Sequence, residues 1–68
     1  MPPKIRKLKA ALSSAGFRWR PGKGSHTFWV HPNLPGEEVT IAGKDGDDAK
    51  PYQIKDVQDA LRKLGKSL

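Results

Sequence analysis

The segment Lys23-Gly24-Ser25-His26 combines residue types that can act on a phosphodiester. An imidazole titrates near physiological pH, so His26 can take up or release a proton. Glycine lets backbone amides approach an anion closely, and Lys23 adds positive charge. His26 could therefore act as a general acid or base, for example in RNA cleavage by the neighbouring 2′-hydroxyl. The alternative is a hairpin histidine with an ordinary hydrogen bond.

Metal and thiol chemistry find little support in the sequence. The chain has no cysteine, so it offers neither a disulfide nor a thiolate ligand. His26 and His31 lie at an odd separation on one expected strand, which directs them to opposite faces. Asp45–Asp48 has the composition of a calcium loop but lacks the flanking helices and the final glutamate. We therefore expect no metal and no cofactor, and we expect His31 to orient the loop after it.

The charge is distributed unevenly along the chain. Thirteen Lys and Arg residues outnumber seven Asp and Glu residues, for a net charge of +6, and residues 1–30 contain no acidic residue. A basic half of this kind favours a polyanion such as RNA. On the expected outer face of the sheet, Trp29 can stack on a base; the alternative is that it covers sheet surface or contacts a partner protein. Asp45–Asp48 is expected to lie away from the RNA. The expected RNA contacts are Lys4, Lys7, Arg18, Arg20, Lys23, Gly24, Ser25 and Trp29.

Two apolar stripes with helical spacing lie towards the two ends of the chain. The first predicts a helix over residues 4–15 that ends at Gly16. The second predicts a helix that Asp56 caps and that ends near Leu64. The stripes are formed by Ile5, Leu8, Leu12 and Ala15, and by Ile54, Val57, Leu61 and Leu64.

Alternation between the stripes predicts strands over residues 17–20, 25–31 and 38–42. The order α-β-β-β-α with short connections favours an α+β fold, a three-stranded antiparallel sheet with both helices on one face. This order is that of a double-stranded-RNA-binding-like fold, and residues 1–68 are expected to form one domain. Phe17, Trp19, Phe28, Val30, Val39 and Ile41 should face the helices. Arg18, Arg20, Thr27, Trp29, His31 and Thr40 should face outward.

The start of the chain and its hydropathy bear on where the protein acts. Met1-Pro2-Pro3-Lys4 lacks the apolar segment of a secretory signal. No apolar run approaches the length that crosses a bilayer. We therefore expect a cytoplasmic protein without membrane contact.

Taken together, these motifs resemble those of a known family. A helix ending in Gly16-Phe17, the segment Lys23–His26 and an aromatic strand ending in His31-Pro32 are similar to the HicA family of toxin mRNA interferases. The resemblance covers about residues 4–64. It implies ribosome-independent cleavage of mRNA on a double-stranded-RNA-binding-like fold, with His26 as the family's histidine. It also implies a HicB-type antitoxin partner that covers the active surface and often binds operator DNA.

The sequence departs from the family pattern after the third expected strand. Many members carry Pro-x-His there, whereas this chain has Ala42-Gly43-Lys44. If that second histidine assists catalysis, this protein should be slow or should mainly bind. The leading interpretation is a metal-independent endoribonuclease toxin with His26 as its catalytic residue. The alternatives are a non-catalytic RNA-binding module and a small domain that binds only its antitoxin.

Overall fold

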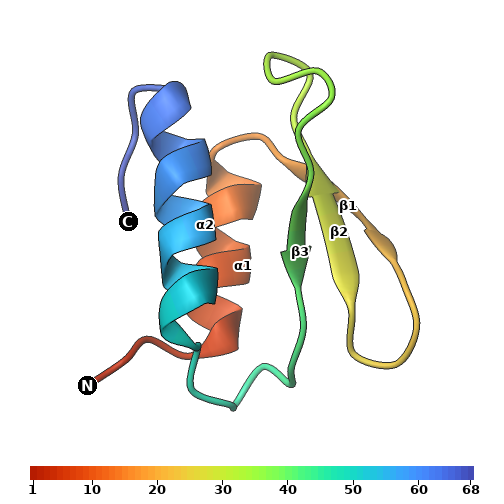
Figure 1. The fold of residues 1–68 in the computed structure, drawn as a ribbon, viewed down its shortest axis with the longest axis vertical. Helices are drawn as coiled ribbons and strands as arrows, with labels where there is room; N and C mark the ends of the chain where they lie inside the picture. Colours follow the sequence, from red (N-terminus) through yellow and green to blue (C-terminus); the bar gives the residue numbers. More distant parts are fainter.

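The chain folds in the predicted order, helix–strand–strand–strand–helix, in a computed structural model that describes residues 1–68. The strands form one antiparallel sheet in the order β1-β2-β3, and both helices cover the same face of it (Figure 1). The predicted α+β fold is therefore confirmed. The elements are α1 (Ile5–Ser14), β1 (Arg18–Pro21), β2 (Thr27–Val30), β3 (Val39–Ile41) and α2 (Pro51–Lys63).

The core lies between the helices and the sheet and uses the two predicted stripes. Ile5, Leu8 and Leu12 of α1 and Val57 and Leu61 of α2 are each at most 1% exposed. From the other side the core is closed by Phe17, Trp29, Val39 and Ile41. Neither helix has the length and apolar character that a membrane span requires.

The acidic segment between β3 and α2 packs on the start of α1. The amides of Ile5 and Arg6 donate to the carbonyls of Asp47 and Asp45, at 2.9 and 3.2 Å. Lys4 pairs with Asp48 at 2.6 Å, and Lys9 pairs with Asp45 at 2.8 Å. These aspartates therefore serve contacts within the molecule, in addition to lying in the loop as predicted.

Helix α2 begins five residues before Asp56, so the prediction that Asp56 caps it is wrong. Pro51 occupies the first turn, where its missing N–H costs no hydrogen bond. The Gln53 side chain accepts the Lys50 N–H at 2.8 Å and donates to the Ala42 carbonyl at 2.7 Å. A buried glutamine therefore fixes this end of the helix and ties it to the end of β3.

The side chains of β2 point to the faces opposite to those predicted. Trp29 is 3% exposed in the core and Thr27 is buried, whereas Val30 is 38% exposed and Phe28 lies half-buried on the open face. The predicted faces of Arg18, Arg20, Val39, Thr40 and Ile41 are confirmed. The prediction for Trp29, and with it for Thr27, Phe28 and Val30, is wrong.

The reason lies in the hairpin register. Trp19 pairs with Trp29, and Pro21 pairs with Thr27, so the connecting loop contains an odd number of residues, 22–26. Directly paired residues share a face, which places both tryptophans on the helix side. Every residue of Thr27–Val30 suits a strand, so the sequence offers no polar alternation that would fix the phase. Trp19 lies on the predicted face but at the edge of the sheet, and it is 57% exposed rather than part of the core.

His31 holds the chain together where α1 meets the loop after β2. Its Nδ1 accepts the Asn33 N–H and its Nε2 donates to the Ala15 carbonyl, both at 3.0 Å. The ring packs edge-on against Phe17. The predicted role in orienting the loop agrees with these contacts. The predicted outward direction is wrong, because the ring turns inward to reach the end of α1.

Candidate functional site

The residues Lys23–His26 form a tight turn at the tip of the β1–β2 hairpin. The His26 amide donates to the Lys23 carbonyl at 3.0 Å. Gly24 has a φ of +59°, and Ser25 does not have a positive φ. This combination fits a type II′ turn, which places glycine at its first central position. This turn therefore places His26 directly before the first residue of β2.

The His26 imidazole is exposed, and its own turn fixes its orientation. Its Nδ1 lies 3.0 Å from the carbonyl oxygen of Lys23. A carbonyl only accepts hydrogen bonds, so Nδ1 carries a proton. In the neutral ring Nε2 then has a free lone pair and faces no protein partner. This tautomer is the one that a general base needs.

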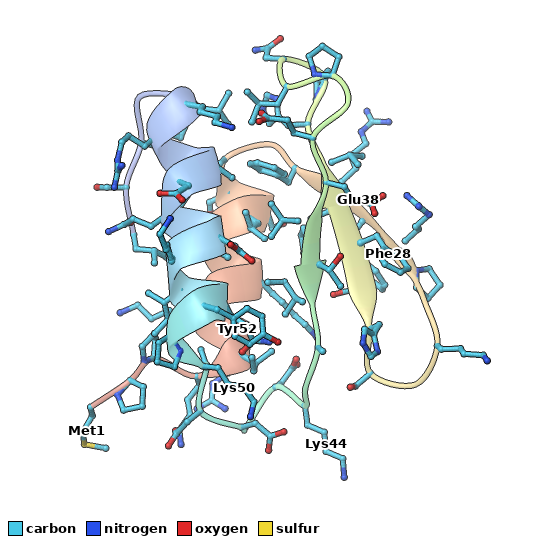
Figure 2. All side chains as sticks on the ribbon, viewed as in Figure 1. Met1, Phe28, Glu38, Lys44, Lys50 and Tyr52 are labelled. Carbon is cyan, nitrogen blue, oxygen red and sulfur yellow. The ribbon has the colours of Figure 1, made fainter.

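Phe28 supports the His26 turn from the open face of the sheet. A Cβ atom at Gly22 would lie 2.5 Å from the Phe28 ring, so only glycine fits where the hairpin crosses that ring. The Arg20 guanidinium lies 5.0 Å from the centre of the same ring. Figure 2 shows Phe28 and Glu38 on the sheet and Lys44 beyond its lower end. The Phe28 ring therefore forms an apolar surface on the open face, next to the His26 turn.

Ser25 connects this turn to the end of β3. Its Oγ accepts the Gly43 N–H at 3.0 Å. Lys44 follows directly, so its backbone lies at the same end of the sheet as the His26 turn. Neither Lys23 nor Lys44 takes part in an ion pair. The spacing in the sequence gave no sign of this contact, because it joins two loops through a backbone amide.

The structure separates the other predicted basic residues into distinct groups. Lys4 pairs with Asp48, and Arg20 pairs with Glu38 at 3.0 Å, so both are partly neutralised. Lys7 lies beside Ile54 and Gln58 of α2, away from the hairpin. Arg18 is exposed on the open face without an acidic partner. Of the predicted cations, Lys23 is therefore the one that the turn brings to His26.

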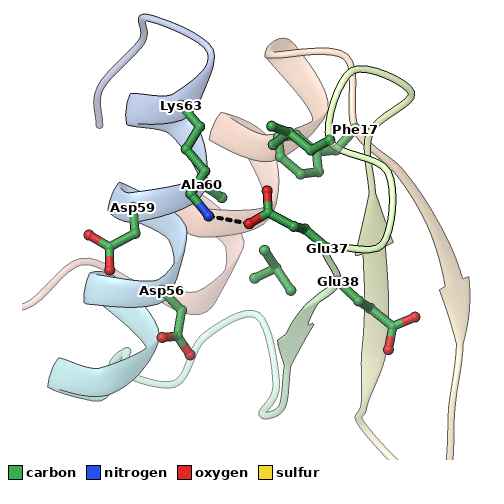
Figure 3. A pocket seen from close by; sticks show the side chains of 9 residues that line it. Phe17, Glu37, Glu38, Asp56, Asp59, Ala60 and Lys63 are labelled. Atoms are coloured by element: carbon green, nitrogen blue, oxygen red, sulfur yellow. Dashed lines mark hydrogen bonds and ion pairs between the residues drawn. The ribbon is translucent and has the colours of Figure 1, made fainter.

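A hollow lies at the β3 edge of the sheet, between β3 and α2 (Figure 3). It has a volume of about 240 Å³, and Lys63 pairs with Glu37 across it. The hydrogen bond from Lys55 holds the pKa of the Asp59 carboxyl below its usual value and raises the pKa of Lys55. Asp59 is therefore ionised at neutral pH, and the hollow repels polyanions. Its lining is Phe17, Leu34, Glu37, Glu38, Val39, Asp56, Asp59, Ala60 and Lys63.

Potential metal ligands are dispersed over the surface. No three His, Asp or Glu side chains come together in a group that could hold an ion. The two histidines serve different loops: His26 lies in the hairpin turn, and His31 is bonded to the end of α1.

Comparison with known proteins agrees with the motifs. A family model described as the HicA toxin of bacterial toxin–antitoxin systems matches residues 5–66. Curated proteins and solved structures gave no match. The matched segment runs from the first residue of α1 to beyond the end of α2, and thus includes the whole sheet and the His26 turn. The chain therefore belongs to the HicA family of toxins from bacterial toxin–antitoxin systems.

Proposed function

We propose that this toxin is an endoribonuclease that cleaves mRNA, with His26 as its general base and without a metal ion. The observation that carries the proposal is the contact of His26 Nδ1 with the Lys23 carbonyl, which leaves Nε2 unprotonated and exposed in the neutral ring. Membership of a toxin family supports an activity that harms the cell. Since mRNA is the substrate, the proposed place of action is the cytoplasm.

The proposed reaction is an internal transesterification. His26 Nε2 removes the proton of a 2′-hydroxyl, and the 2′-oxygen forms a bond to the adjacent phosphorus. The bond from phosphorus to the 5′-oxygen breaks, and that oxygen takes a proton from water. The hydroxide left by that water accepts the proton that His26 had taken, which restores the neutral imidazole. The products are a 2′,3′-cyclic phosphate and a 5′-hydroxyl. Lys23, Lys44 and the amides of Gly24 and Ser25 would stabilise the charge on the phosphate oxygens.

The test uses two RNA oligonucleotides that differ at one sugar. We expect the purified protein to cleave the all-ribose strand in a buffer containing a chelator. A single 2′-deoxy substitution at the cleaved position should abolish that cut, because the nucleophile is then missing. Gel analysis of both strands between pH 6 and 8 gives the result. RNA that is bound but stays intact would instead support the non-catalytic RNA-binding module.

The dependence of RNA affinity on salt tests the assignment of Lys23. Each phosphate that a cation neutralises on a single strand contributes about −0.7 to the slope of log affinity against log salt. We expect Lys23→Gln to flatten the slope by about that amount. Lys7→Gln is the matched control: it removes the same charge on the far side of α1, beside Ile54 and Gln58, and should leave the slope unchanged. Equal slopes for the wild type and Lys23→Gln would remove Lys23 from the phosphate site.

The family also implies an antitoxin partner. We propose that this partner is of the HicB type and that it inhibits by covering the His26 turn. A protein that covers this turn would block access of RNA to Nε2, so cleavage should stop at equimolar antitoxin.

A further inference from the structure

A groove runs between α1 and the exposed edge of the sheet. It has a volume of about 510 Å³. Arg6, Lys9 and Ser13 of α1 form one wall, Trp19 of β1 forms the other, and Trp29 lies beneath. We refer to it as the Trp19 groove. It is separate from the acidic hollow, which lies at the opposite edge of the sheet beside β3.

Trp19 has the orientation of a preformed stacking platform. Its ring stacks on Trp29, with centroids 6.0 Å apart and planes inclined by 30°. Trp29 is itself fixed, because its Nε1 donates to Thr27 Oγ1 at 2.8 Å and that hydroxyl donates to the Ile41 carbonyl at 3.3 Å. Although one face of the Trp19 indole is supported, the residue remains 57% exposed. The core therefore holds a large flat apolar surface in solvent.

The groove also carries positive charge beside this platform. Arg6 takes part in none of the six ion pairs, so its guanidinium is available to an anion. Lys9 is paired with Asp45, which also lines the groove, so Arg6 supplies the net positive charge; Ser13 adds a hydroxyl. A free cation next to an exposed indole complements a nucleotide, which joins an anionic phosphate to a flat base.

We propose that the Trp19 groove is a subsite for an unpaired base of the RNA substrate, stacked on the free face of Trp19 with its phosphate near Arg6. The inference rests on the proposed function, and it adds a requirement for single-stranded RNA. Trp19 pairs with Trp29, three residues along β2 from His26, which corresponds to about 10 Å of strand. The groove lies on the helix side of the sheet and the His26 turn adjoins Phe28 on the open face, so RNA that occupies both passes around the β1 edge.

The test measures binding of a probe that cannot be cleaved. A fluorescein-labelled 2′-O-methyl oligoadenylate has bases and phosphates but no free 2′-hydroxyl, so its affinity is independent of catalysis. We expect Trp19→Ala to weaken binding roughly 5- to 150-fold, the range for loss of one stacked base. Trp19→Phe should retain most of the affinity. Tyr52→Ala is the matched control, because Tyr52 is also 57% exposed but lies on α2.

Tryptophan fluorescence provides a second readout. The oligonucleotide should quench the wild type, and the quenching should disappear in Trp19→Phe, where only the buried Trp29 remains. Circular dichroism would confirm that each variant is folded. Trp19→Ala with wild-type affinity for the probe, or a duplex that competes as well as the single strand, would overturn the inference. If the wild type binds the probe in a Trp19-dependent way but does not cleave RNA, the proposed nuclease activity is refuted and the proposed subsite is retained.

Discussion

Replacing His26 by alanine should lower the rate of RNA cleavage by about 10²–10⁴-fold, the usual contribution of a general acid or base. The fold should survive, because the side chain is exposed and makes one hydrogen bond, to the Lys23 carbonyl in its own turn. In cells, the same change should relieve the growth arrest caused by expression of the toxin. Single-turnover cleavage of an oligoribonucleotide by wild type and variant, purified in parallel, measures the difference.

His31→Ala is the matched histidine control for this experiment. His31 bonds to Ala15 and Asn33, so its loss should lower the free energy of unfolding by about 0.5–1.5 kcal/mol for each bond. The cleavage rate of the folded fraction should stay the same. Cleavage by His26→Ala at the wild-type rate would show that another group is the base or that the activity is a contaminant.

The second large effect concerns Trp29 and acts on stability rather than on RNA. Trp29→Ala should lower the free energy of unfolding by about 3–5 kcal/mol, because it removes a buried indole from the core. Small domains have only about 5–15 kcal/mol in total, so this variant should be close to unfolding. Urea denaturation followed by far-ultraviolet circular dichroism measures the change without relying on tryptophan fluorescence.

Two comparisons make the Trp29 result specific. Leu61→Ala removes another core side chain and should cost about 2–5 kcal/mol. Trp19→Ala should cost much less, since that indole is more than half exposed. Equal stability of Trp29→Ala and the wild type would show that the strand phase described above is incorrect.

The helices were predictable because each has to bury a continuous stripe. The spacing of Ile5, Leu8 and Leu12 admits one helical face, and Gly16 marks its end with a φ of +96°. The start of α2 was not predictable in this way. It depends on Gln53, whose side chain reaches both Lys50 and the end of β3, and a glutamine has no distinctive pattern in a sequence.

The sequence did not determine which face of the sheet each β2 side chain occupies, for a different reason. A change in the hairpin loop from four to five residues moves every following side chain of the strand to the opposite face of the sheet. Because Thr27–Val30 are all good strand formers, only the three-dimensional register decides between the two. The consequence for the site is an exchange of roles: Trp29 enters the core, and Trp19 is the tryptophan left at the surface.

The His26 turn, in contrast, was recognisable from consecutive residues. Lys23, Gly24 and Ser25 act locally, through one carbonyl, one positive φ and one hydroxyl. What the sequence did not reveal is the link from Ser25 to Gly43, which adds Lys44 to the same end of the sheet. Contacts between distant loops leave no periodic signal.

The acidic segment between β3 and α2, which packs on the start of α1, also has an electrostatic consequence for the proposed substrate. The first four amides of α1 already have acceptors, in the carbonyls of Lys4, Asp45 and Asp47. The positive end of the helix dipole is therefore closed to phosphate, although helix starts often bind such anions. Of the three aspartates in this segment, Asp45 and Asp48 pair with Lys9 and Lys4, and Asp47 has no basic partner. The proposed RNA substrate is therefore expected to bind its phosphates elsewhere, at cations without an acidic partner such as Lys23 and Arg6.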